Sequence, residues 1–112
     1  MDQADLKRMI QGPLAAVPPA FKGDYSLDLG RMADLTDWWI DQGIANGRTA
    51  LKVTAAIGEG PDLADDEWPQ VLETVVRRAN GRVPIIAGLK TSGTYQTARD
   101  AKRAQDLGAI GV

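Results

Sequence analysis

Three short apolar segments, each followed by a longer amphipathic stretch, limit the folds open to this chain more than any other feature. The segments lie at residues 14–17, 49–54 and 83–89. The last one shows no alternation of polar and apolar residues, which is typical of a strand buried on both faces. Strands separated by helical stretches at intervals of roughly 30 residues or more form βαβ units. The sequence therefore predicts an α/β fold with a parallel sheet.

Helix signals fill the intervals between these segments. Apolar residues recur at helical spacing, most regularly from Trp68 onward, and polar or glycine residues stand at the ends of each stretch. The sequence predicts four helices: residues 2–10; residues 28–43, with Asp28 as N-cap and Gly43 as stop; a helix from about Asp65 to residues 80–81, with the acidic residues 65–67 in its first turn; and a helix between the loop and cap at residues 91–94 and Gly108.

Residues 109–112 are apolar or glycine and are expected to begin a fourth strand. A strand that has only started leaves the preceding helix without a strand to cross over to. We therefore expect a single domain over residues 1–112, with about three βα units, the start of a fourth strand and a short N-terminal helix. We expect it to be the N-terminal part of something longer.

The composition excludes several kinds of chemistry. The chain contains no cysteine and no histidine, which removes thiolate nucleophiles, thiolate metal sites and Ser-His triads. The net charge of -2 favours neither a nucleic acid nor an anionic membrane as partner. The acidic start and the lack of an apolar run of roughly 20 residues predict a cytoplasmic protein. We expect no metal, because a helix N-terminus accounts for most of the carboxylates at residues 62–67. We also expect no cofactor.

Residues 51–61 form the most informative stretch of the chain. They read as a buried strand that runs into a glycine-rich turn just before a helix. In α/β proteins ligands bind at the carboxyl ends of strands, and a glycine-rich turn offers backbone N–H groups to an anion. The pair Gly58 and Gly60 lacks the third glycine of a dinucleotide fingerprint, and Pro61 removes a donor. The stretch is therefore a candidate ligand site but a poor match to a dinucleotide site.

Five motifs follow one another along the chain. They are residues 15–21, with Pro19-Ala20-Phe21 after a short apolar segment; residues 27–44, a capped helical stretch; Gly58-Glu59 and the helix after it; residues 81–88; and residues 104–112. They resemble the first strand with its Thr-Pro-Phe signature, the first helix, the Gly-Thr-Thr-Gly-Glu loop, the third strand and the entry to the fourth strand of the dihydrodipicolinate synthase / N-acetylneuraminate lyase family of pyruvate-dependent class I aldolases. Each motif is weak alone, but their order and spacing together are specific to the family, and the resemblance covers almost the whole chain.

The resemblance implies a fold and a reaction. The fold is the N-terminal part of a (β/α)8 TIM barrel. The reaction is reversible aldol cleavage or condensation of pyruvate, or a related 2-oxo acid, through a lysine Schiff base, in a protein expected to be a homo-oligomer. The family's Schiff-base lysine and catalytic tyrosine lie on later strands, and no residue of this chain matches them. We therefore assign no catalytic residue, and we expect the chain alone to be inactive.

The resemblance also implies a substrate-binding turn. The family's paired threonines bind the pyruvate carboxylate and relay a proton, whereas Ala56 and Ile57 stand at their positions without a hydroxyl. The expected substrate-binding residues are Ala56, Ile57, Gly58 and Thr54, the last of these two residues before the pair. Glu59 is expected to line the site and to accept hydrogen bonds within the loop, with a general-base role as the alternative.

Two lysines and the overall function leave alternatives open. Lys90, at the carboxyl end of the third strand, is a site-lining nucleophile in one interpretation and a solvated or carboxylate-bound lysine in the other. Lys52 lies within the second strand and is expected to snorkel or to pair with a carboxylate inside the barrel. The alternative to a segment of an aldolase is a non-catalytic βα-repeat module that serves binding or assembly, as the missing hydroxyls suggest.

Overall fold

The computed structural model describes residues 1–90 and 93–112. Its sheet contains β1 (Leu14–Val17), β2 (Ala50–Val53) and β3 (Ile85–Ala87), all parallel and in the order β1-β2-β3. Along one row of the sheet Ala15 lies beside Leu51, which lies beside Ile85. The predicted parallel sheet is confirmed. Its second and third strands are shorter than expected because Thr54 leaves the strand conformation and Pro84 has no N–H for the ladder.

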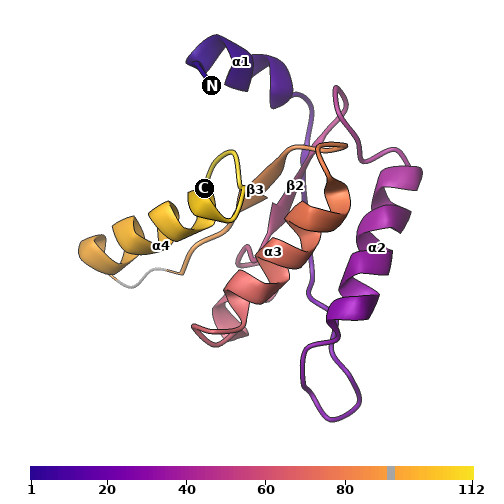
Figure 1. The fold of residues 1–112 in the computed structure, drawn as a ribbon, viewed down its shortest axis with the longest axis vertical. Coiled ribbons are helices and arrows are strands. Elements are labelled where there is room, and N and C mark those ends of the chain that lie inside the picture. Colours follow the sequence, from indigo (N-terminus) through magenta and orange to yellow (C-terminus); the bar gives the residue numbers. More distant parts are fainter. Residues whose placement is uncertain (91–92) are drawn as a thin grey trace.

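Four α-helices and one short 3-10 helix accompany the sheet in the described part of the chain (Figure 1). Helix α3 lies between α2 and α4 and in front of β2, whereas α1 stands apart near the beginning of β1. This arrangement of parallel strands with helices on one side is that of successive βα units. The elements are α1 (Gln3–Met9), α2 (Leu29–Asp41), η1 (Gly60–Asp62), α3 (Trp68–Ala79) and α4 (Thr94–Asp106).

The ends of α2 confirm the expected signals. The Asp28 carboxylate accepts a hydrogen bond from the Arg31 backbone N–H at 3.0 Å, as an N-cap does. Beyond the other end, Gly43 has a φ of +103°, a conformation that side chains other than glycine's rarely adopt. Helix α2 therefore begins and ends where the sequence predicts.

The expected beginning of α3 at Asp65 is wrong, because the helix starts at Trp68. The Glu67 carboxylate accepts a hydrogen bond from the Ala64 backbone N–H at 2.8 Å and closes a turn over residues 64–67. Pro69 then occupies the first helical turn, where its missing N–H costs nothing. The acidic residues 65–67 thus precede the helix and do not form its first turn.

The loop and cap expected at residues 91–94 fall partly on Thr91 and Ser92, which lie outside the described residues. From Gly93 on the chain is described, and α4 begins at Thr94. After α4, Gly108 has a φ of +107° and ends the helix as expected. The Ile110 N–H then donates to the Ile85 carbonyl at 2.9 Å, and Gly111 forms a parallel bridge with Ile86. The predicted start of a fourth strand is confirmed at the outer edge of β3.

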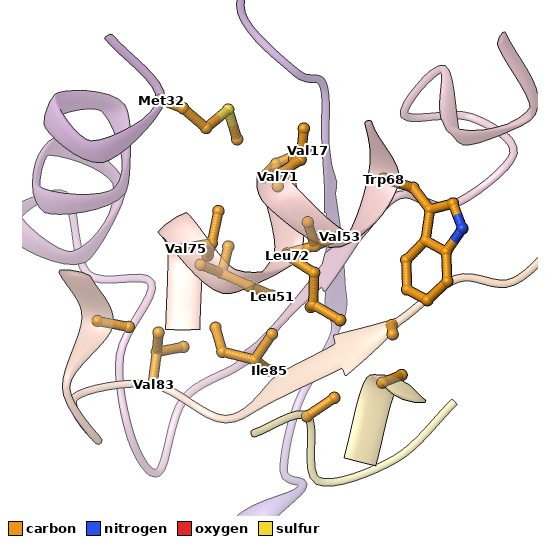
Figure 2. Packing of buried hydrophobic residues seen from close by; sticks show 14 of the residues in the cluster. Val17, Met32, Leu51, Val53, Trp68, Val71, Leu72, Val75, Val83 and Ile85 are labelled. Atoms are coloured by element: carbon orange, nitrogen blue, oxygen red, sulfur yellow. The ribbon is translucent and has the colours of Figure 1, made fainter. Parts of the chain in front are cut away.

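The core fills the space between the sheet and the helices (Figure 2). Leu51 and Val53 of β2 lie against Leu72 and its neighbours on α3, and these side chains are almost fully buried. Lys52 alternates with them and so belongs to the opposite, partly exposed face of the sheet. The buried cluster comprises Val17, Ala20, Met32, Trp39, Leu51, Val53, Leu63, Trp68, Val71, Leu72, Val75, Ala79, Val83, Ile85, Ala87, Ala104 and Ala109.

A charged cluster joins α2 to α3 and to Arg82, which follows α3. Asp37 on α2 accepts hydrogen bonds from Arg78 at 2.7 Å and from Arg82 at 2.5 Å. The hydrogen bond from Arg82, with that from Arg78, holds the pKa of the Asp37 carboxyl below its ordinary value of 3.8. Two guanidinium groups on one carboxylate therefore connect segments that are about 40 residues apart in sequence.

Replacing Leu72 by alanine is expected to destabilise the fold by about 2–5 kcal/mol, because the removed atoms leave a cavity in the core. Leu72 is 0% exposed, whereas Leu14 on the edge strand β1 is 47% exposed. Leu14→Ala is the matched control and should cost about 0.5 kcal/mol or less. Urea unfolding measures both changes. Equal losses in the two variants would contradict the described position of the core.

Replacing Asp37 by asparagine is expected to lower the thermal unfolding midpoint at neutral pH, because the two arginines lose their shared carboxylate. Since the folded-state pKa of Asp37 is lowered, its contribution is complete above the ordinary value of 3.8 and is lost as the pH falls through the folded value. The difference in midpoint between wild type and variant should therefore shrink as the pH falls below 3.8 and through the lower folded value. Asp41→Asn, an exposed carboxylate on the same helix, is the control. A difference that persists in acid would contradict the assignment.

Candidate functional site

The turn that follows β2 lies at the carboxyl ends of the three strands. Thr54 has a φ of +59°, and this left-handed residue takes the chain out of the strand. A β-branched residue in that conformation is strained by on the order of 1–3 kcal/mol. The Gly60 N–H then donates to the Ala55 carbonyl at 2.9 Å, which closes the turn before η1. The turn therefore comprises residues 54–60, within the stretch that the sequence marks as the candidate site.

Three glycines allow the backbone of this turn to pack directly against the strand ends. A Cβ atom on Gly60 would lie 1.8 Å from the Thr54 carbonyl oxygen, and one on Gly88 would lie 2.4 Å from the Ala55 Cα. A Cβ on Gly58 would lie 2.5 Å from the carbonyl oxygen of Val17, the last residue of β1. Real Cβ atoms do not approach other atoms so closely. The turn is thus wedged between the ends of β1 and β3.

The expected substrate-binding residues divide into buried and exposed ones. Thr54 and Gly58 are buried, whereas Ala56 is exposed and Ile57 is 90% exposed. In the described part of the chain, no backbone carbonyl accepts a hydrogen bond from the N–H of Ala56, Ile57 or Gly58. These three consecutive groups remain free to bind an anion.

The hydroxyl of Thr54 lies within the protein and does not face the exposed part of the turn. Its Oγ1 atom is 2.6 Å from the Val53 carbonyl oxygen and 2.8 Å from the Gly88 carbonyl oxygen, and the residue is 5% exposed. The Gly88 N–H donates in turn to the Val53 carbonyl at 2.7 Å. Substrate binding by Thr54 stays a prediction, but this geometry gives the single O–H proton of Thr54 two carbonyl acceptors within the protein.

Glu59 stands directly before η1, at the start of the loop that leads to α3, and Lys90 contacts the same loop. Glu59 is exposed and left-handed, and its backbone carbonyl accepts a hydrogen bond from Asp62 at 3.1 Å, while its carboxylate does not cap η1. The Lys90 amine donates to the Leu63 carbonyl and lies 4.0 Å from the Asp65 carboxylate. These contacts fit a lysine that braces the loop, which is the less reactive of the two interpretations of Lys90.

Among residues 1–90 and 93–112, no group of three or more carboxylates is arranged to hold a metal ion. In the same residues no helix is long and apolar enough to cross a membrane. The acidic residues near η1 have other contacts, such as those of Glu67 with Ala64 and of Asp65 with Lys90.

The sequence did not single out Gly88 and Val17 as parts of the site. Both make their contacts through the backbone, and only the position of Gly88 at the end of an apolar segment could have indicated its role. A glycine just after a buried strand is a signal for close backbone approach. Val17 carries no such signal, because any residue supplies a carbonyl oxygen.

Parallel βα units in sequential strand order are the arrangement with which a (β/α)8 barrel begins, and barrels of this class bind their ligands at the carboxyl ends of the strands, where the glycine-rich turn lies. A family model described as the dihydrodipicolinate synthetase family matches residues 9–112, and the chain belongs to that family.

Known proteins agree with this assignment. The 4-hydroxy-tetrahydrodipicolinate synthase of Jannaschia sp. is 39% identical over 102 residues, which is 90% of this chain and 33% of that protein. The crystal structure of dihydrodipicolinate synthase from Aquifex aeolicus matches 91% of this chain and 33% of its own, with a TM-score of 0.80 and 30% identity. The chloride-inhibited dihydrodipicolinate synthase from Acinetobacter baumannii, complexed with pyruvate, matches 90% and 33%, with a TM-score of 0.76 and 32% identity. The chain thus spans about a third of the length of these relatives.

Replacing Gly60 by alanine is expected to destabilise the protein by about 1–3 kcal/mol or more, because the new Cβ would meet the Thr54 carbonyl. Gly23→Ala is the matched control, since nothing lies within 4 Å of a Cβ at Gly23. Urea unfolding gives the two free energies of unfolding, and amide NMR spectra show where the structure changes. A Gly60 variant as stable as the Gly23 variant would contradict the close packing of the turn.

Proposed function

We propose that this chain supplies the carboxylate-binding part of the substrate site of a Schiff-base aldolase or lyase that acts on pyruvate or a related 2-oxo acid. The observation that carries the proposal is the turn at residues 56–58, which is exposed at Ala56 and Ile57 and whose three backbone N–H groups have no hydrogen-bond partner in the described chain. Membership of the family and the pyruvate bound by the Acinetobacter baumannii relative support the choice of ligand.

In the proposed site the backbone binds the substrate, and side chains contribute little. The carboxylate of the 2-oxo acid accepts hydrogen bonds from the N–H groups of Ala56, Ile57 and Gly58. Neither Ala56 nor Ile57 has a hydroxyl that could pass a proton, so another part of the enzyme performs the proton relay. This division lets the turn orient the 2-oxo group without taking part in bond making.

The bond-making step lies elsewhere in this proposal. A lysine amine attacks the 2-oxo carbon, water leaves, and the resulting Schiff base withdraws electrons from the neighbouring carbon. No residue of the chain matches the family's lysine or tyrosine for this step, and Lys90 is held by the Leu63 carbonyl and Asp65. The chain alone is therefore inactive. Its assembly as a homo-oligomer and its cytoplasmic location stay predictions from the sequence.

Two observations favour a second candidate function, a non-catalytic βα module for binding or assembly. The two residues at the proposed carboxylate site have no hydroxyl, and β1 leaves Leu14 about half exposed at the edge of the described sheet. An open, apolar strand edge is a surface that another chain can pair with. In this alternative the turn after β2 binds no 2-oxo acid.

Incubating the chain with pyruvate and borohydride is expected to give no covalent adduct in a mass spectrum, because borohydride traps only a Schiff base. A parallel titration with pyruvate should shift the amide NMR signals of residues 56–58 and leave those of α2 unchanged. A longer family member with its own lysine is the positive control for trapping. An adduct on this chain would contradict its proposed inactivity, and unshifted amides would favour the assembly module.

A further inference from the structure

Thr54 occupies a position where glycine would be the relaxed residue. Its φ of +59° belongs to the left-handed region, which a β-branched side chain disfavours. The residue is nevertheless 5% exposed and well packed at the end of β2. Since a glycine would relieve the strain at once, the threonine side chain must contribute something that a glycine lacks.

The contribution is a set of hydrogen bonds between the ends of β2 and β3, which we call the β2–β3 clasp. In the clasp the Thr54 hydroxyl lies 2.8 Å from the Gly88 carbonyl oxygen, and the Gly88 N–H donates to the Val53 carbonyl at 2.7 Å. Both polar backbone groups of Gly88 are thereby bound to the end of the neighbouring strand. The clasp depends on the missing side chain of Gly88, because a Cβ there would collide with Ala55.

The clasp also determines the direction in which the chain enters the exposed turn. Residues 55–58 follow Thr54 directly. Gly58 packs closely against the Val17 carbonyl at the end of β1. The turn is therefore fixed at one end by the clasp and at the other by β1. Between these two supports lie the free N–H groups of residues 56–58.

We infer that Thr54 is a positioning residue, whose hydroxyl holds the turn so that the N–H groups of residues 56–58 converge on one carboxylate. The clasp itself follows from the hydrogen bonds, whereas its use for a carboxylate rests on the proposed function. Thr54 in this assignment does not touch the ligand. It contributes by binding Gly88.

The test compares Thr54→Val with Thr36→Val in the 15N-labelled chain. Both threonines are buried and bond to a backbone carbonyl, but Thr36 binds Met32 within α2, away from the turn. Thr54→Val should shift the amide signals of residues 55–58 and accelerate hydrogen exchange at Gly88 by about tenfold. Thr36→Val should leave both unchanged. Thr54→Ser, which keeps the hydroxyl, should restore the wild-type signals.

Thr54→Gly keeps the inference testable if the valine variant does not fold, because it removes the hydroxyl and the strain together. Wild-type turn amides and Gly88 exchange in the glycine variant would overturn the inference, as would equal effects of Thr54→Val and Thr36→Val on the turn. Pyruvate added to each variant separates the two proposals. Weaker binding in Thr54→Val with recovery in Thr54→Ser supports positioning. If pyruvate does not shift the amide signals of the wild-type chain, the carboxylate role is overturned. The spectra recorded without pyruvate still decide whether the clasp exists.

Discussion

Direct backbone packing at the carboxyl ends of the strands is the constraint on which this structure depends. Gly60 and Gly88 bring two other chain segments onto the backbone of Thr54 and Ala55 at distances that no side chain would permit. This contact sets the path of the turn, the start of the loop to α3 and the separation of β2 from the residues after β3. The helices and the core pack against a sheet whose strand ends are brought together by these glycines.

The fold could be predicted largely from periodicity and caps, whereas the site could not. Asp28 and Gly43 bound α2 as expected because caps act over a few neighbouring residues. The predicted start of α3 was wrong because the Glu67 carboxylate accepts from the Ala64 N–H and closes a separate turn before the helix. Acidic residues suit either such a turn or the first turn of a helix, so their presence alone does not decide between the two. The roles of Val17 and Gly88 arise from backbone contacts between distant segments, which leave little trace in one sequence.

The site differs in character from the hydroxyl-based one that the family resemblance implies. Where that resemblance places paired threonines, this chain exposes Ala56 and Ile57, and its nearest threonine hydroxyl is turned inward to Gly88. In the proposed site, binding and proton transfer are thereby separated: the backbone holds the anion, while proton transfer needs groups from outside this turn. The Lys90 amine, like the Thr54 hydroxyl, is bonded within the protein, because it donates to the Leu63 carbonyl.

The order of the strands has a consequence for how the chain folds. Each strand pairs with the strand that comes next in the sequence, and α2 packs on α3, the helix that follows it. Contacts of this kind close short loops first, so each βα unit can dock as soon as its predecessor is formed. Folding can therefore proceed from the N-terminal unit during synthesis, with β2, supported on both sides, as the last strand to open when the protein unfolds.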